Sequence, residues 1–185
     1  MDRHDLAQRI ADAAVRYGTF TLRSGRTSHY YLDKYRFTTR PELLGEIGRL
    51  LAARISPNVT RLAGAELGGI PLVTAASLET GLPAVFIRNQ KKDYGTAQQI
   101  EGAIESSDTV VVVEDIATTG GQVVEAAKAI AETGATIDRI IAVIDREEGA
   151  RENIEAAGFV FESLFTKHDL GIEEREEHTA RTTQE

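Results

Sequence analysis

Two carboxylates followed by a short run of threonine and glycine give the clearest chemical signal in this 185-residue sequence. Glu114 and Asp115 come directly after four consecutive valines, and Thr118 to Gly121 follow shortly afterwards. Because carboxylates only accept hydrogen bonds, an adjacent pair of them suits the hydroxyl groups of a sugar. Small residues at the start of a helix leave backbone N–H groups free to bind a phosphate. The stretch therefore indicates a site for a phosphorylated sugar.

Each part of this stretch also has a purely structural interpretation. Paired acids are common at helix caps, and residues 118–121 can form a tight turn between a strand and a helix. The functional interpretation gains weight because the acids and the Thr/Gly loop occur together. We therefore expect this loop to bind the phosphate of the sugar and the acids to bind its hydroxyls.

Cations gather in a polar stretch, RNQKKDYGTAQQIEG, which runs from Arg88 to Gly102. It includes Lys91, Lys92 and Tyr94 and has little apolar periodicity. A connection of this length is typically a functional flap or a disordered segment. A cationic flap can close on an anionic leaving group and stabilise the charge that develops on it. The alternative is that these are ordinary solvated surface charges.

Two further segments carry polar or glycine-rich ends. GAELGGIP, at residues 64–71, follows an apolar run, and its glycines allow a ligand to approach the main chain closely. Arg146 follows another apolar run, and its guanidinium can form two parallel hydrogen bonds to a carboxylate. Pairing with the adjacent Glu147 or Glu148 is the structural alternative for this arginine.

The elements that must position these residues alternate between strand and helix. Helical spacing of apolar residues predicts helices at 6–17, 41–55, 70–80 and from 123 onward, with a short helix leading to Gly158. Apolar runs predict strands at 61–65, 84–87, 110–113, 137–144 and 159–165. This order favours an α/β fold with a central parallel sheet flanked by helices. Ligands of such sheets bind at the carboxyl ends of the strands.

The sequence predicts a single domain over residues 1–185. Residues 20–37 alternate around a Ser-Gly turn and predict a β-hairpin outside the main sheet. With the first helix, this hairpin would form an N-terminal cap, or hood, over about residues 1–40. Residues 171–185 are charged and poor in apolar side chains, which predicts a flexible tail.

Composition narrows the classes of function. A net charge of −8 argues against a nucleic-acid surface, which requires a basic face. No apolar run has the length of about 20 residues that a membrane span requires. The chain contains no cysteine, which excludes disulfides and thiolate metal sites, and its histidines lack metal-ligand spacing. The N-terminus lacks the apolar core of a signal peptide, so we expect a cytoplasmic protein.

Residues 110–122, VVVVEDIATTGGQ, resemble the phosphoribosyl-diphosphate (PRPP) motif of the type I phosphoribosyltransferases. Four further segments are similar to orotate-specific members of that family, archaeal ones in particular. They are FTLRSGRTSHYYLD, GAELGGIP, RNQKKDYG and IDREEGAR, and they occur in the family's order. The resemblance covers about residues 15 to 165. It implies transfer of ribose 5-phosphate from PRPP to orotate, which gives orotidine 5′-monophosphate and pyrophosphate in pyrimidine biosynthesis.

The resemblance also implies roles for individual residues. Those implied to bind PRPP are Leu67, Gly68, Arg88, Lys92, Tyr94, Glu114, Asp115, Ile116, Ala117, Thr118, Thr119, Gly120, Gly121 and Gln122. Those implied to bind orotate are Arg23, Tyr31, Leu32, Thr118 and Arg146. The implied catalytic residues are Lys92, Glu114 and Asp115. Mg²⁺ would be carried mainly by the oxygens of PRPP, and a homodimer would share the flap between its subunits.

Several positions depart from the family pattern. Family members often have lysine where this chain has Arg23, Gly68 and Asn89, and histidine where it has Tyr94. Gly68 and Asn89 remove charge, and a tyrosine cannot donate a proton near neutral pH as an imidazolium does. Two alternatives therefore stay open: transfer to a purine or to uracil, and a regulator that binds PRPP or nucleotides without catalysis.

Overall fold

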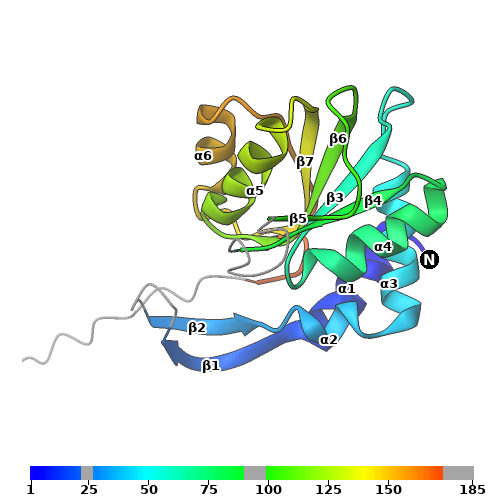
Figure 1. Cartoon of the computed structure of the whole chain (residues 1–185). Helices are drawn as coiled ribbons and strands as arrows, with labels where there is room; N and C mark the ends of the chain where they lie inside the picture. Colours follow the sequence, from blue (N-terminus) through cyan, green and yellow to red (C-terminus); the bar gives the residue numbers. More distant parts are fainter. Residues whose placement is uncertain (22–26, 90–98, 173–185) are drawn as a thin grey trace, which may run out of the picture.

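A six-stranded sheet forms the centre of the computed structural model, which describes residues 1–21, 27–89 and 99–172 (Figure 1). The strand order is β5-β4-β3-β6-β7-β8. The strands are β3 (Arg61–Ala65), β4 (Ala84–Ile87), β5 (Ile100–Glu101), β6 (Thr109–Ala117), β7 (Thr136–Asp145) and β8 (Phe161–Thr166). Neighbouring strands are parallel, except that β5 runs antiparallel to β4. The predicted parallel α/β fold is confirmed, whereas β5 was not predicted because two residues give no readable periodicity.

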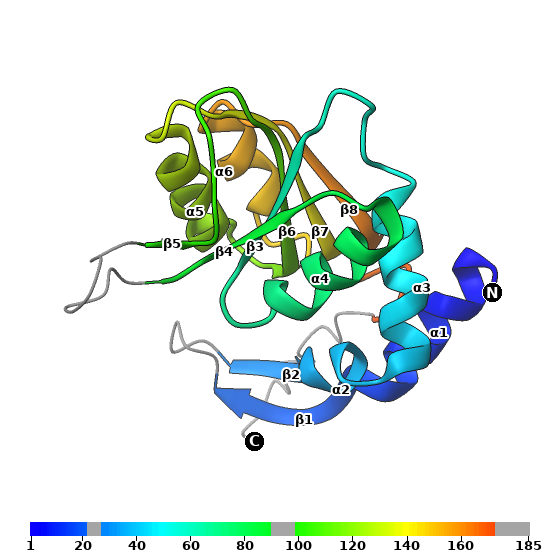
Figure 2. The ribbon, with the colours of Figure 1, turned by 45° about the vertical axis from the view of Figure 1, so that its right-hand side comes forward.

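Helices cover both faces of the sheet (Figures 1 and 2). One core contains buried residues of α1 (Arg3–Ala14), α3 (Pro41–Ala52) and α4 (Gly69–Thr80), and the other those of α5 (Gly121–Ala131) and α6 (Ala150–Ala156). Successive strand residues point to opposite faces, so Val111 and Val113 pack in the first core and Val110 and Val112 in the second. All four valines are fully buried, as expected of a strand covered on both sides.

The first helix is shorter than its apolar spacing predicts. Asp2 caps α1 by accepting a hydrogen bond from the Asp5 N–H, and the helix ends at Ala14 rather than near Gly18. Val15 already has extended backbone angles and pairs with Leu32 of the hairpin. Pairing with a second strand therefore overrides the helical pattern from Val15 onward, which no local signal indicates.

Proline and glycine mark helix ends as predicted. Pro41 occupies the first turn of α3, where its missing N–H costs nothing. Gly81 ends α4 in the left-handed region, with φ of 74°, and its N–H donates to the Ser77 carbonyl at 2.8 Å. Both helix boundaries are confirmed because the signals for them are local.

The predicted hairpin forms a separate two-stranded antiparallel sheet of β1 (Val15–Thr21) and β2 (Thr27–Leu32). It lies apart from the main sheet (Figure 2). Tyr30 and Leu32 of β2 are buried, whereas Tyr31 is exposed, as the two-residue period of a strand requires. The end of the segment predicted as hairpin is instead helical, in α2 (Tyr35–Thr38). The hood thus consists of α1, β1, β2 and α2.

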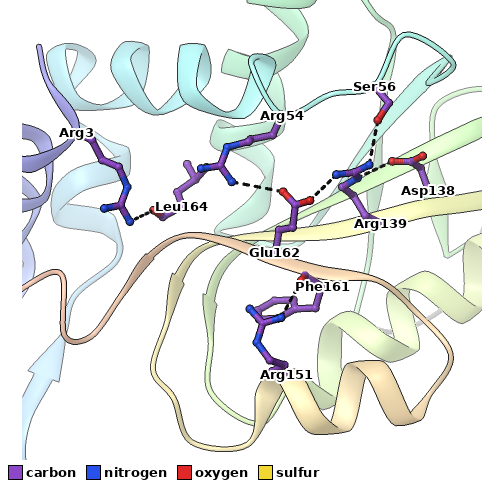
Figure 3. Close-up of polar contacts among 9 residues, drawn as sticks. All are labelled: Arg3, Arg54, Ser56, Asp138, Arg139, Arg151, Phe161, Glu162 and Leu164. Atoms are coloured by element: carbon purple, nitrogen blue, oxygen red, sulfur yellow. Dashed lines mark hydrogen bonds and ion pairs between the residues drawn. The ribbon is translucent and has the colours of Figure 1, made fainter.

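A network of ion pairs links β7, β8 and the segment after α3, at the amino ends of these strands (Figure 3). Arg139 donates to Asp138, to Glu162 and to the Ser56 hydroxyl, and Arg54 approaches the other Glu162 oxygen at 3.5 Å. Because this end of the sheet is opposite the carboxyl ends of the strands, we assign the network to stability.

The C-terminal segment packs further than predicted. Leu170 is 3% exposed and Ile172 is 2% exposed, and both belong to the first hydrophobic core. The expectation of a flexible tail from residue 171 is therefore wrong for residues 171–172, because Ile172 finds apolar neighbours there; residues 173–185 lie outside the described segments. Across these segments, no helix combines the length and apolarity that crossing a bilayer would require.

Candidate active site

A cavity of about 630 Å³ opens at the carboxyl ends of β3, β4, β6 and β7, beside β2 of the hood. The residues that line it are Tyr31, Leu32, Lys34, Ala65, Glu66, Asn89, residues 114–123 and Arg146. Parallel strands bring their carboxyl ends to one edge, which is why residues so far apart in the sequence meet here. The cavity is large enough for a small-molecule substrate.

The loop between β6 and α5 has the geometry of an anion site. Gly120 has φ of 76°, and a Cβ built on it would lie 2.8 Å from Ile154 Cγ1. The Asn153 amide of α6 donates to the Thr119 carbonyl at 2.9 Å, which holds the loop in place. No side chain in the described segments caps the first turn of α5. Its backbone N–H groups therefore favour a bound phosphate.

The acidic pair lies at the end of β6, on the wall of the same cavity. The Asp115 side chain is 3% exposed, and Glu114 is half-buried. The Asp115 N–H donates to Glu114 Oε1 at 3.1 Å. Burial, together with the neighbouring charge of Asp115, raises the pKa of Glu114 well above its ordinary value. Glu114 therefore gives up its proton less readily than an exposed glutamate does.

Lys34 of the hood faces this pair. Its Nζ lies 2.8 Å from Asp115 Oδ2 and 5.6 Å from the centre of the Tyr35 ring. Burial alone would lower the pKa of Lys34, but the hydrogen bond and negative charge of Asp115 outweigh it, so the pKa is raised. The lysine is therefore charged and forms an ion pair with the Asp115 carboxylate.

Arg146 reaches the cavity from the end of β7. It is 7% exposed, and its guanidinium carbon lies 4.8 Å from the centre of the Tyr30 ring. Its Nη2 also lies 2.9 Å from Glu148 Oε1, as the structural alternative for this arginine predicts. The pairing does not remove Arg146 from the cavity wall, so the side chain can still meet an anionic ligand.

Two loops complete this edge of the sheet: the loop from β3 to α4 and the loop that follows β4. The Asn89 N–H donates to Glu66 Oε1 at 2.7 Å, and its amide donates to the Glu66 carbonyl at 3.4 Å. Gly68 lies so close to Asp115 that a Cβ built on it would be 1.6 Å from Oδ2. The loop after β3 is thus joined to β4 on one side and packed against the acidic pair on the other.

The structure brings most of the sequence-predicted residues to this cavity. Tyr31, Leu32, residues 114–122 and Arg146 line it, and Gly68 contacts its wall through Asp115. Leu67 and Arg88 do not line it: Leu67 is 61% exposed, and Arg88 Nη1 lies 3.8 Å from Glu101 Oε1. The predictions for Arg23, Lys91, Lys92 and Tyr94 concern residues outside the described segments.

The sequence analysis assigned no binding role to five residues of the cavity wall: Lys34, Ala65, Glu66, Asn89 and Val123. Lys34 carried one available signal, because it lies in the cap segment of a chain that has only five lysines. Asn89 was noted only as a departure from the family pattern and Glu66 only as part of GAELGGIP, because their contact joins two loops that are separate in the sequence. Ala65 and Val123 are simply the neighbours of functional loops.

The acidic pair also bears on whether the cavity could hold a metal ion. In the described parts of the chain, no three His, Asp or Glu side chains converge in a way that could hold a metal ion. Two adjacent carboxylates are nevertheless compatible with Mg²⁺, which protein sites often bind through one or two carboxylates together with phosphate oxygens of a substrate.

Comparison with known proteins decides the family. The family model described as phosphoribosyl transferase domain matches residues 36–174. Orotate phosphoribosyltransferase of Natronomonas pharaonis is 48% identical over 171 residues, which cover 92% of this chain and 98% of the relative. That of Halobacterium salinarum is 49% identical over 164 residues, covering 89% and 93%. The chain belongs to the orotate phosphoribosyltransferase family.

A solved structure of an orotate phosphoribosyltransferase agrees with the fold. The Mycobacterium tuberculosis enzyme in complex with PRPP has a TM-score of 0.77 and 33% identity, covering 93% of this chain and all of the other. The predicted type I phosphoribosyltransferase fold is confirmed by these comparisons, as is the predicted class of enzyme, a transferase.

Proposed function

We propose that this orotate phosphoribosyltransferase family member transfers the 5-phosphoribosyl group of PRPP to orotate, giving orotidine 5′-monophosphate and pyrophosphate in pyrimidine biosynthesis. One observation carries the proposal. A helix N-terminus suited to a phosphate, an acidic pair suited to ribose hydroxyls and a nearly buried arginine suited to a carboxylate all line one cavity.

The ribose 5-phosphate half of PRPP would occupy the β6–α5 loop. Backbone N–H groups of residues 118–121 would bind the 5-phosphate, where the partial positive charge of the helix end favours an anion. Glu114 and Asp115 would accept hydrogen bonds from the ribose hydroxyls. These contacts hold the anomeric carbon in one place, and such positioning is a large part of catalysis in a displacement reaction.

Orotate would lie between the hood and the end of β7. Its carboxylate matches the guanidinium of Arg146, and the ring would contact Tyr31 and Leu32 of β2, with Thr118 and Arg23 as further ligands. Orotate arrives as an anion, so the protein need not supply a strong base. Glu148, which pairs with Arg146 in the free protein, would then share the arginine with the substrate carboxylate.

Pyrophosphate is the leaving group, and negative charge develops on it in the transition state. We propose that Lys92, Arg88 and Tyr94 of the flap and the backbone at Leu67 and Gly68 stabilise that charge, with the flap reaching the site of a second subunit in a homodimer. Mg²⁺ bound to PRPP would neutralise part of the same charge. Sedimentation of the protein would test whether it forms a dimer. We also propose that the reaction takes place in the cytoplasm.

A product assay tests the function directly. The protein is incubated with PRPP, Mg²⁺ and each of orotate, uracil, adenine, guanine and hypoxanthine, and the nucleotide and pyrophosphate are identified by chromatography. We expect orotidine 5′-monophosphate and one equivalent of pyrophosphate from orotate alone. Turnover of a purine or of uracil but not of orotate would show that the base substrate is not orotate. PRPP binding without turnover would favour a regulator that does not catalyse transfer.

A further inference from the structure

Lys34 is the hood residue that reaches the acidic pair. Its Nζ lies 2.8 Å from Asp115 Oδ2, and the Asp115 side chain is 3% exposed, so the lysine holds a nearly buried carboxylate. A nearly buried carboxylate is costly without a cationic partner, because burial removes it from water. Lys34 supplies that partner for Asp115.

The backbone of Lys34 is fixed where α2 begins. The Lys34 carbonyl accepts hydrogen bonds from the Phe37 N–H at 3.3 Å and from the Thr38 N–H and hydroxyl at 3.1 Å. The preceding residue, Asp33, donates its N–H to the Ala14 carbonyl at 2.9 Å and so joins this turn to the end of α1. The lysine stem thus extends toward Asp115 from a rigid base rather than from a free loop.

Gly68 lies against the same Asp115 oxygen that pairs with Lys34. A Cβ on Gly68 would lie 1.6 Å from Asp115 Oδ2 and 3.1 Å from Lys34 Cδ. A glycine at this position therefore leaves the space that the Lys34–Asp115 pair occupies.

We propose that Lys34 is a positioning residue for PRPP: with the Ile116 N–H, which donates to Asp115 Oδ1 at 2.5 Å, it holds the Asp115 carboxylate in the orientation in which that carboxylate accepts a ribose hydroxyl. The inference rests on the proposed function, since it deepens the role of the acidic pair. It also connects the base-binding hood to the ribose-binding strand through one ion pair, so that the two halves of the cavity are held together. The ribose hydroxyls are already bound in the PRPP complex before any bond breaks, so loss of Lys34 should appear chiefly in the affinity for PRPP.

Substitution of Lys34 separates this role from a structural one. In Lys34→Met, which keeps the length and apolar stem, we expect the KM for PRPP to rise about tenfold, as loss of one charge-assisted contact implies. The kcat and the KM for orotate should stay within about threefold, the pattern of lost uniform binding. Lys34→Arg should restore the KM for PRPP.

Lys128→Met is the matched control, because Lys128 forms an exposed ion pair with Glu125 on α5. It loses the same charge and should match the wild-type kinetics. Calorimetric titration with PRPP checks that the effect is in binding, and Asp115→Asn completes a double-mutant cycle. In the Asp115→Asn background, Lys34→Met should weaken PRPP binding no further.

Two results would overturn the inference: a KM for PRPP in Lys34→Met equal to that of the Lys128→Met control, or additive effects in the cycle. If Lys34→Met does not fold, Lys34→Gln measured against Lys34→Arg makes the same comparison. A wild-type protein that fails to convert orotate would instead refute the proposed function, and the PRPP titrations would still test Lys34.

Discussion

Gly120 is the residue at which a single added methyl group should matter most. Its φ of 76° lies in the left-handed region, which costs a residue with a Cβ about 1 to 2 kcal/mol. The new Cβ would also lie 2.8 Å from Ile154 Cγ1 and 3.2 Å from the Ala150 carbonyl. Ile154 is fully buried, so it cannot move aside without disturbing the core.

The expected magnitude follows from these two costs. Overpacking of a well-packed core typically costs about 1 to 3 kcal/mol, so Gly120→Ala should lower the free energy of unfolding by about 2 to 5 kcal/mol in total. With a urea dependence of about 2 kcal/mol per molar, the unfolding midpoint should fall by about 1 M or more. A loop that relaxes to relieve the overlap would lose its phosphate geometry, so affinity for PRPP should fall as well.

The neighbouring glycine provides the control. A Cβ on Gly121 would meet only Thr119 Oγ1, at 4.0 Å, and Gly121 is the first residue of α5. Gly121→Ala should therefore be as stable as the wild type or slightly more stable, since alanine favours helix over glycine. Urea unfolding followed by circular dichroism compares the two variants. Equal midpoints for Gly120→Ala and Gly121→Ala would refute the reasoning from φ and from the Ile154 contact.

Three further substitutions test other parts of the molecule. Asp108 accepts hydrogen bonds from Arg61 at 2.6 Å and from the Glu105 N–H at 2.8 Å; burial raises its pKa, but these contacts outweigh burial and lower it. The stability that results is fully present above a pH of about 4, the pKa of an aspartate in the unfolded chain, and is lost as the pH falls through the lower pKa of the folded protein. Asp108→Asn should therefore lower the free energy of unfolding by about 3 kcal/mol at pH 7 and by progressively less below pH 4, which denaturant titrations would measure. Gly68→Ala should displace the Asp115 carboxylate and so break its ion pair with Lys34, which should raise the KM for PRPP about tenfold. An unchanged KM would show that the loop after β3 moves to make room for the methyl group. Lys92→Ala should lower kcat more than it weakens PRPP binding, and an unchanged kcat would remove this lysine from the mechanism.

Local signals account for most of the fold that could be predicted. Pro41 and Gly81 mark helix ends because each acts on its own backbone angles, and the four valines of β6 indicate burial on both faces because of their composition. The predicted helix failed beyond Ala14 because Val15 pairs with Leu32, a partner distant in the sequence. Ile172 is likewise buried through packing in the first hydrophobic core, which the charged sequence around it does not indicate.

The candidate site divides in the same way. The β6–α5 loop, the acidic pair and the family could be recognised from the sequence, because their residue types are adjacent and their spacing is specific. The cation that faces Asp115, and the reason why Gly68 has no side chain there, became visible only in the folded protein. Lys34 of the hood and Asp115 at the end of β6 come together because the hairpin and α2 pack beside the main sheet. The two residues are far apart in the chain, and the sequence around neither of them indicates this contact.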